Sequence, residues 1–452
     1  MGFFKNIYDA ARARLLLIVG GFVALYQLIA AAFHALTKGK GPVKDRLAAL
    51  LPLPATQRNG FAVLRAFWPN LVLSKSLITS YPNSGTVIVT RANDVIEVLD
   101  READFEVVYE PKMKAITDGS NFFLGMQDSA AYQHDVSIMR LVMPRDDVAS
   151  VVTPLARRKA QEFSAAHEKR IDLPQDLTRR VPAAIVIDYF GVAAGAEQDV
   201  ISWATTLFWW LFTDLKGDPE VELKALAAAK ALRDSIDATL AARKASGDKK
   251  DDLVGRALAL QAGAPEFNDI AIRNNLIGIV IGAIPTISKA SVQAVEQLLD
   301  RPEALAGARA AALAGDEALL GAYVFEALRF NPVNPAIYRR ATRDVTIAAA
   351  TLRAAHVKKG AMVLASNLSA MFDPKAIDEP EAFRADRPWG DYLLWGYGLH
   401  TCFGAYINRA VIPELLAPVL SRPNLRRAAG AAGEIDYGDT PGFPQHFVLE
   451  SD

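Results

Sequence analysis

The chain has 452 residues, of which 51% are apolar and 22% charged, which is enough apolar material for a large buried core. Its 50 basic and 51 acidic residues nearly cancel, so we expect no nucleic-acid partner, because such proteins usually carry a basic excess. A single cysteine excludes an internal disulfide and any all-cysteine metal cage.

The first predicted element is an apolar helix. Residues 15–37 contain no charged side chain and, as a helix, are long enough to cross a bilayer. Four basic residues follow between positions 38 and 46, and then Pro52 and Pro54, which is typical of a hinge. We expect residues 1–44 to be a membrane anchor and hinge, and residues 45–452 to be one domain on the cytoplasmic side. A helix that lies along the bilayer or packs on its own domain, a secretory signal, and a soluble cytoplasmic protein are the alternatives.

The rest of the chain predicts an α+β fold that is mainly α. A β-branched run predicts a strand at residues 86–90, followed by a helix at 92–102. Long alanine-rich helices are expected through residues 151–300, with breaks at 216–219 and 246–248. Strand patterns return at residues 345–347 and 362–364. Blocks of β, then α, then β favour packed layers over alternating βαβ units.

The most informative segment is the glycine-rich loop at residues 395–404, Trp-Gly-Tyr-Gly-Leu-His-Thr-Cys-Phe-Gly. Its three glycines indicate tight turns, and a helix is predicted directly afterwards, at residues 405–420. A cysteine before a helix N-terminus faces backbone N–H groups and the positive end of the helix dipole, which favour a thiolate. Cys402 is therefore a candidate nucleophile or metal ligand.

This loop resembles the haem-ligand loop of the cytochrome P450 family, with Trp395 where the family usually has Phe. Upstream, Glu326 and Arg329 resemble the family's E-x-x-R helix. The resemblance covers about residues 45–452. It implies a P450-like fold with small β-sheets behind the N-terminal apolar helix, and haem b as cofactor. It also implies that Cys402 is the iron ligand, and it assigns to the cofactor site His134, Arg140, Arg339, Trp395, His400 and Gly404.

The helix expected at residues 274–299 departs from the family. Members usually carry an acid followed by an alcohol there, which relay protons to oxygen, but this chain has Ile284 and Pro285. A proline inside a helix is expected to kink it and widen its groove. A kink or a π-bulge would let Thr286 or Ser288 replace the missing alcohol. The candidate catalytic residues are therefore Ile284, Pro285, Thr286 and Ser288.

The resemblance implies an oxidoreductase of cytochrome P450 type, a monooxygenase that inserts oxygen into a small apolar organic substrate. Electrons would come from a separate ferredoxin or reductase. The missing relay favours an alternative, a peroxide-dependent or hydroperoxide-rearranging enzyme. A non-catalytic haem-binding or sensor protein is an alternative of another class. A thiol hydrolase using Cys402 fits poorly, because the glycine-rich loop would have no role.

Overall fold

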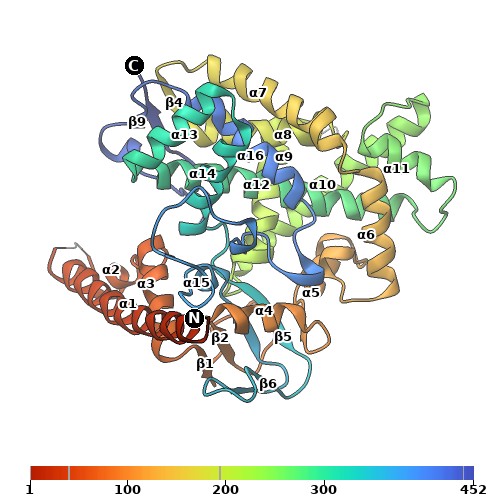
Figure 1. The fold of residues 1–452 in the computed structure, drawn as a ribbon. Helices are drawn as coiled ribbons and strands as arrows, with labels where there is room; N and C mark the ends of the chain where they lie inside the picture. Colours follow the sequence, from red (N-terminus) through yellow and green to blue (C-terminus); the bar gives the residue numbers. More distant parts are fainter. Residues whose placement is uncertain (1, 39–40, 193–194, 441) are drawn as a thin grey trace. The chain divides into compact units, whose positions relative to one another are not determined.

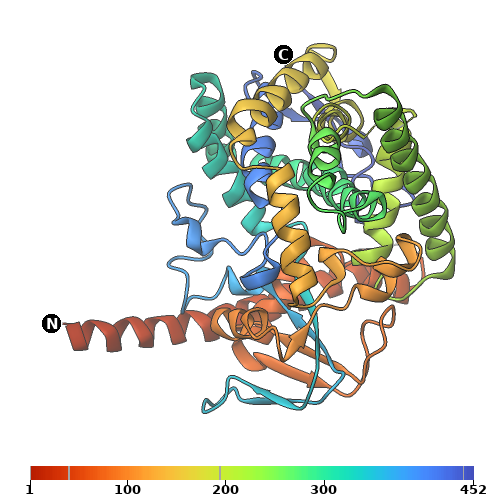
Figure 2. The same ribbon diagram turned by 90° about the vertical axis from the view of Figure 1, so that its right-hand side faces the viewer.

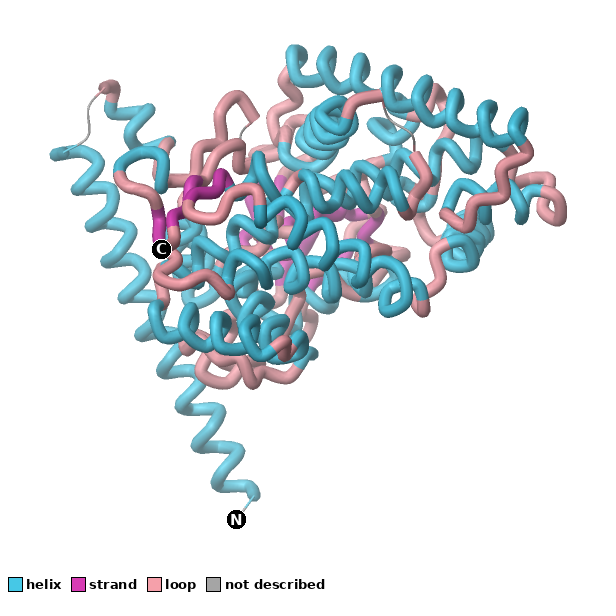
Figure 3. The backbone as a smooth tube through the Cα atoms, turned by 90° about the horizontal axis from the view of Figure 1, so that it is seen from above, coloured by secondary structure: helices cyan, strands magenta, loops and turns pink. Residues whose placement is uncertain are grey.

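The computed structural model describes residues 2–38, 41–192, 195–440 and 442–452. By their internal contacts the residues form two compact units, which we describe separately. Unit 1 comprises Met1–Glu106 and Leu328–Thr401, and unit 2 comprises Val107–Ala327 and Cys402–Asp452. Helices dominate the secondary structure, as expected from the sequence (Figure 3).

Unit 1 contains a five-stranded sheet in the order β1-β2-β8-β5-β3 and a two-stranded sheet, β6-β7. Strands β2 and β8 pair in parallel, with Thr86 opposite Met362, and the neighbouring pairs are antiparallel. The strands are β1 (Asn70–Leu73), β2 (Thr86–Val89), β3 (Phe105–Glu106), β5 (Ile337–Ala341), β6 (Val345–Ile347), β7 (Ala355–Val357) and β8 (Met362–Ala365). The helices are α1 (Gly2–Lys38), α2 (Val43–Ala48), α3 (Pro54–Phe67), α4 (Ala92–Asp100) and α15 (Asn367–Ala370).

The core of unit 1 lies between this sheet and α4. Val95, Val98 and Leu99 recur at helical spacing on α4 and are fully buried. They join Val87 and Val89 of β2 in one apolar cluster. The five-stranded sheet is thereby fixed against a helix.

Helix α1 packs against α3 through a stripe of mostly small residues, and the two lie side by side in Figure 1. The stripe repeats every three or four residues and includes Gly21, Ala24 and Leu28. A Cβ at Gly21 would lie 2.5 Å from Ala66 Cβ, so the two helices approach as closely as glycine allows. The N-terminal turns of α1 extend beyond α3 (Figure 2).

Between Leu15 and Leu36, the surface of α1 that faces away from α3 is mostly apolar and exposed. The exposed large side chains are Leu15, Leu16, Ile18, Val19, Phe22, Val23, Leu25, Tyr26, Ile29, Phe33 and Leu36. Residues 10–38 of α1 are long and apolar enough to cross a membrane, as is the mostly buried α12 of unit 2 (Asp269–Leu299). The expected apolar helix is therefore present, and it is docked on one side. The expected boundary after residue 44 remains a prediction.

Unit 2 is built almost entirely from helices. They are α5 (Glu110–Ile116), α6 (Ala130–Val142), α7 (Thr153–Ala165), α8 (Arg180–Asp188), α9 (Glu197–Phe208), α10 (Pro219–Ser246), α11 (Leu253–Gln261), α12, α13 (Pro302–Ala314) and α16 (Ala405–Leu420). Helix α14 (Glu317–Phe330) runs from unit 2 into unit 1. A three-stranded sheet, β4-β10-β9, completes unit 2 with Arg170–Asp172, Val448–Glu450 and Arg426–Arg427.

Local sequence accounts for where these helices begin and end. Helix α10 begins at Pro219 because the Asp218 side chain accepts the Glu220 N–H, and it ends before Gly247, which takes a left-handed φ of 66°. The breaks expected at residues 216–219 and 246–248 are thus confirmed. The strands expected near residues 86–90, 345–347 and 362–364 are also confirmed, as is the helix expected at residues 405–420.

Candidate functional site

Cys402 lies two residues before Gly404, the N-cap of α16. Burial among the surrounding protein atoms raises the pKa of its thiol, although part of the side chain is exposed to solvent. Three features lower the pKa: the nearby backbone N–H groups of Gly404 and Ala405 and the positive charge of Arg140. The Ala405 N–H itself donates to the Cys402 carbonyl oxygen at 3.2 Å. Burial outweighs these three influences on the pKa of the thiol.

Arg140, on α6, is held against the residues that follow the cysteine. Its Nη1 donates to the carbonyl oxygen of Phe403 at 2.9 Å. Its guanidinium lies 3.7 Å from the ring centre of Phe403 and 4.9 Å from that of Tyr406. The structure therefore brings Arg140, Cys402 and Gly404 together, as the sequence predicted.

His134 is not part of this group. It lies on the exposed side of α6, with Nε2 3.6 Å from Glu266 Oε1. Six residues separate His134 from Arg140, which places the two side chains about 120° apart around the helix. Its assignment to the cofactor site remains a prediction, and its surroundings are those of a surface histidine.

The glycines of the loop are required by the backbone. Gly396 and Gly398 have φ values of 80° and 72°, in the region that side chains disfavour. A Cβ at Gly398 would also lie 2.9 Å from the carbonyl oxygen of Leu99. A Cβ at Gly396 would meet Ile337 of β5 at 3.5 Å, so the loop packs against the strand that carries Arg339.

The remaining predicted cofactor residues all lie in unit 1. Arg339 is 3% exposed and pairs across the sheet with Val363. The Trp395 ring stacks on that of Trp389, with centres 5.4 Å apart. His400 Nε2 lies 3.3 Å from Glu102 Oε2, so an acidic side chain adjoins this histidine.

Glu326 and Arg329, on α14, are both fully buried. Arg329 donates to the carbonyl oxygens of Met371, Pro380 and Ala382 at 3.0, 2.8 and 3.1 Å. Ala382 stands where the family usually has an arginine that joins this cluster. Nearby, Arg387 is buried and donates to the same Ala382 oxygen at 2.8 Å, whereas Arg384 pairs with Asp386. Arg387 thus occupies the structural place that Ala382 leaves.

Helix α12 runs without interruption from Asp269 to Leu299, through Pro285, and contains no π-turn. Ile284 is fully buried, and its aliphatic side chain has no proton to donate. Thr286 Oγ1 donates to the carbonyl oxygen of Gly282, one turn back. The Ser288 hydroxyl is buried and bonded to that of Thr178 at 2.9 Å. Because Thr286 and Ser288 lie about 160° apart around the helix, only one of them can face any given groove.

Lys289, one turn beyond Thr286, was not among the site residues predicted from the sequence. Its side chain is 9% exposed, and burial lowers its pKa to about 8. A signal was present, because Lys289 is the only basic residue between Arg273 and Arg301 in a strongly apolar helix. No motif marks it.

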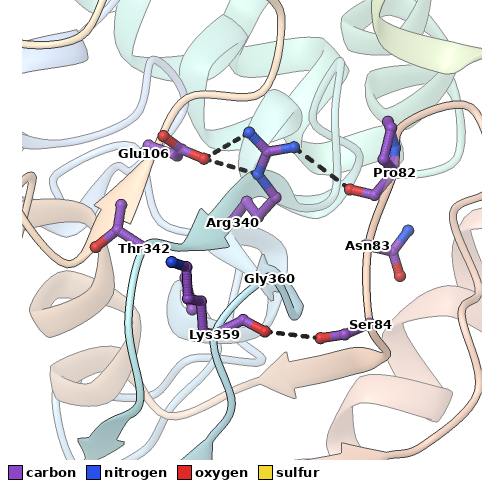
Figure 4. A pocket seen from close by; sticks show the side chains of 9 residues that line it. Pro82, Asn83, Ser84, Glu106, Arg340, Thr342, Lys359 and Gly360 are labelled. Atoms are coloured by element: carbon purple, nitrogen blue, oxygen red, sulfur yellow. Dashed lines mark hydrogen bonds and ion pairs between the residues drawn. The ribbon is translucent and has the colours of Figure 1, made fainter.

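Unit 1 also has a hollow of about 390 Å³ beside β5 (Figure 4). Arg340 pairs there with Glu106 at 2.6 Å, and Ser84 Oγ donates to the Lys359 carbonyl oxygen at 2.9 Å. None of the predicted site residues lines the hollow. Its polar groups largely bond to one another.

Comparison with known proteins decides the family. The family model described as cytochrome P450 matches residues 79–422, more than half of the chain. The chain is a member of the cytochrome P450 family. The expected fold and family are thereby confirmed.

Curated relatives of this P450 are distant. It is 26% identical over 282 residues to cyclomarin C epoxidase of Salinispora arenicola, covering 62% of this chain and 67% of that protein. It is 28% identical over 284 residues to the steroid C26-monooxygenase of Mycobacterium tuberculosis H37Rv, covering 62% and 66%. It is also 24% identical over 403 residues to a bifunctional dioxygenase–epoxy alcohol synthase of Fusarium oxysporum, covering 80% of this chain but only 31% of that larger protein.

Solved structures share the fold. P450BioI, solved with an acyl carrier protein carrying hexadec-9Z-enoic acid, superimposes with a TM-score of 0.76 at 18% identity, covering 89% of this chain and all of that one. CalO2 gives a TM-score of 0.73 at 18% identity, covering 89% and 97%. At these identities the likeness shows the fold alone.

The cofactor of this family is haem b, and the residues around Cys402 fit it. A sulfur near the backbone N–H groups of a helix N-terminus and near an arginine suits a thiolate ligand to iron. Open space adjoins two glycines of unit 2, because a Cβ at Gly404 or at Gly282 would meet no atom within 4 Å. One side of the backbone is therefore open at Gly404, two residues after the cysteine, and at Gly282 in the middle of α12.

Proposed function

We propose that this P450 is a monooxygenase that inserts oxygen into a small apolar organic substrate, supplied with electrons by a separate ferredoxin or reductase. The observation that carries the proposal is the placing of Cys402, with N–H donors from α16 and Arg140 against Phe403. Relatives named as an epoxidase and a monooxygenase support oxygen insertion as the chemistry. In a haem-thiolate site, the thiolate ligand would donate electron density to the iron, which favours O–O cleavage.

The chain's own residues then have distinct tasks. Cys402 would hold the iron, and the nearby N–H groups of Gly404 and Ala405 would stabilise the negative charge of the sulfur. Arg140 and Arg339 supply cationic partners for the two propionates, and His400 a hydrogen-bonding one. The buried aliphatic face of α12 around Ile284 excludes water.

The assignment of Cys402 is tested by Cys402→Ser. The unmodified protein, reduced and treated with carbon monoxide, should show the red-shifted Soret band of a thiolate ligand, and Cys402→Ser should abolish it. Thr401→Ser, which keeps a hydroxyl at the neighbouring position, is the control and should retain the band. A surviving band in Cys402→Ser would show that another residue binds the iron.

A second candidate is a P450 that takes its oxygen from a peroxide or an organic hydroperoxide. The specific observation in its favour is α12, where Ile284 is buried and aliphatic and Pro285 has no hydroxyl. A peroxide-driven enzyme needs neither the acid–alcohol relay nor a reductase. Turnover with each oxidant separates the two candidates. A protein that binds haem and turns over with neither would support the haem-sensor alternative.

We also infer that α1 attaches the protein to a membrane, with the haem domain on the cytoplasmic side. The support is its exposed apolar perimeter together with the basic residues that flank it, including Arg12, Arg14 and Lys38. Retention of the full chain in membranes after an alkaline wash is the expected result. Release by the wash would point to a helix that packs on its own domain or lies along the bilayer.

A further inference from the structure

Lys289 is a buried charged side chain whose one recorded interaction among the described residues is with an aromatic ring. It lies on α12, is 9% exposed, and forms no hydrogen bond or ion pair with any residue in the described parts of the chain. Its ammonium instead lies 5.3 Å from the ring centre of Phe443. A buried ammonium normally pairs with an acid or with carbonyl oxygens, because an isolated buried charge is strongly unfavourable.

Lys112, the other lysine of unit 2 that is buried among the described residues, has the partners that Lys289 lacks. Lys112 Nζ donates to the carbonyl oxygen of Trp210 at 2.5 Å, and the carboxylates of Asp214 and Glu222 act on it favourably. Burial lowers the pKa of both lysines to about 8, but for Lys289 burial is the only influence. Among the described residues, Lys289 therefore has no acidic or carbonyl partner of the kind that Lys112 has.

The surroundings of Lys289 are apolar and aromatic. Phe443 packs edge-on against Phe208 of α9, with ring centres 5.6 Å apart. Phe208 in turn contacts Phe212, and Phe212 contacts Tyr109, at 4.6 and 4.8 Å. The ammonium thus adjoins a continuous row of aromatic rings, which suits a hydrocarbon chain better than a hydrated ion.

Lys289 also shares a face of α12 with the part of that helix that protein atoms do not fully cover. Gly282, Ala283 and Thr286 are only partly buried, whereas most of their neighbours on α12 are buried. Gly282, Thr286 and Lys289 fall within about 60° of one another around the helix, and Gly282 lies roughly 10 Å from Lys289 along its axis. A molecule that binds at Lys289 and extends along this face reaches the open space beside Gly282.

We propose that Lys289 binds the carboxylate of an apolar carboxylic acid, whose hydrocarbon chain runs along α12 towards Gly282. This inference rests on the proposed function and specifies its substrate class. The carboxylate supplies the missing charge partner, and the aromatic row supplies contacts for the chain. A neutral apolar compound of the same length lacks the first of these interactions.

The test compares dodecanoic acid with 1-dodecanol, two probes of equal chain length that differ in the head group. Calorimetric titration of the full-length haem-loaded protein at pH 7 should show the acid binding at least about tenfold more tightly than the alcohol. Lys289→Met keeps the length of the side chain and removes the charge. It should weaken binding of the acid by about tenfold or more and leave the alcohol within about twofold.

Lys230→Met is the matched control, because it removes one positive charge from the exposed surface of α10 and should leave both affinities unchanged. Equal binding of acid and alcohol by the unmodified protein would overturn the inference, even if Lys289→Met failed to fold. Unchanged acid binding in Lys289→Met would do the same. In either case a normal thiolate spectrum and turnover of neutral compounds would leave the proposed function standing, whereas loss of that spectrum in the unmodified protein would overturn the function itself.

Discussion

At the scale of single residues, Ile284 and Pro285 bear most directly on the choice of oxidant. Cleavage of the O–O bond of dioxygen consumes two protons, and general-acid help in such steps is commonly worth about 10²–10⁴-fold. Ile284 supplies no proton, and the Thr286 hydroxyl is engaged by the carbonyl oxygen of Gly282. A preformed peroxide already carries oxygen at the required oxidation level.

We therefore expect peroxide-driven turnover to be unusually good relative to reductase-driven turnover, and Ile284→Glu combined with Pro285→Thr to shift the balance towards dioxygen. The measurement is product formed per haem with each oxidant, on one panel of apolar substrates. Pro285→Ala is the control, because it restores the helix N–H without adding a hydroxyl. Tight coupling of electrons to product in the unmodified protein, with peroxide inactive, would contradict this expectation.

Lys289 gives a prediction about stability that is separate from ligand binding. Burial lowers its pKa from 10.5 to about 8 in the folded protein, so folding opposes its protonation. Below pH 8 Lys289 is charged in both the folded and the unfolded protein, so burying the charge lowers the free energy of unfolding by its full amount. This destabilisation disappears as the pH rises towards 10.5, where the unfolded protein also loses the proton. Replacing Lys289 with Met should raise the free energy of unfolding at pH 7 by up to about 3 kcal/mol.

The check is denaturant unfolding of both proteins without ligand, at pH 7 and at pH 10. The gain from Lys289→Met should be largest at pH 7 and much smaller at pH 10. A gain that does not change with pH would show that packing, and not charge, is responsible.

Residues with a motif were easier to predict than residues whose role depends on packing. Cys402 and Arg140 stand in recognisable segments, and the structure brings them together. His134 stands in such a segment too, yet the exposed side of α6 carries it towards Glu266. Lys289 has no motif, because its significance depends on residues such as Phe208 and Phe443 that only the fold brings near it.

At the scale of elements, α1 combines two surfaces that the sequence does not separate. Small residues such as Gly21 and Ala24 face α3, and large ones such as Tyr26 face away. The apolar content of the sequence predicted helix α1 and its length. It did not predict that α1 packs against α3. Strand and helix positions elsewhere followed from periodicity and capping residues, whereas the pairing of β2 with β8 depends on a contact across most of the chain.

We expect membrane attachment to depend on the face of α1 opposite α3. Changing Val19, Tyr26 and Phe33 together to Glu places charges on that face and leaves the contact with α3 intact. The variant should fold, bind haem and move from the membrane to the soluble fraction. The control changes three exposed leucines outside α1 to Glu, namely Leu223, Leu313 and Leu352. Equal membrane retention of both variants would show that α1 is not the attachment site.

At the scale of the whole molecule, the near-zero net charge conceals a strong asymmetry. The first 75 residues contain ten basic and two acidic side chains. The remaining residues contain 40 basic and 49 acidic side chains. Each basic residue near an anionic lipid surface contributes about 1 kcal/mol of attraction, and salt screens it. The basic part of the chain is therefore the part that also carries the exposed apolar helix.

The purified protein should consequently bind vesicles that contain phosphatidylserine more tightly than vesicles of phosphatidylcholine alone. Raising the salt concentration should reduce this difference, while the apolar contribution of α1 remains. Co-sedimentation with both kinds of vesicle at low and high salt measures the two contributions. Equal binding to both vesicles at low salt would exclude a role for the basic residues.

The five-stranded sheet of unit 1 also determines an order of events during synthesis. Strand β2 ends at Val89, but its parallel partner β8 ends at Ala365. At about 5–20 residues per second, a ribosome needs roughly 14–55 s to make the intervening chain. Throughout that interval the edge of β2 that later pairs with β8 has no partner strand. The nascent chain therefore carries an exposed strand edge, open to pairing with other chains, well before its cysteine has been made.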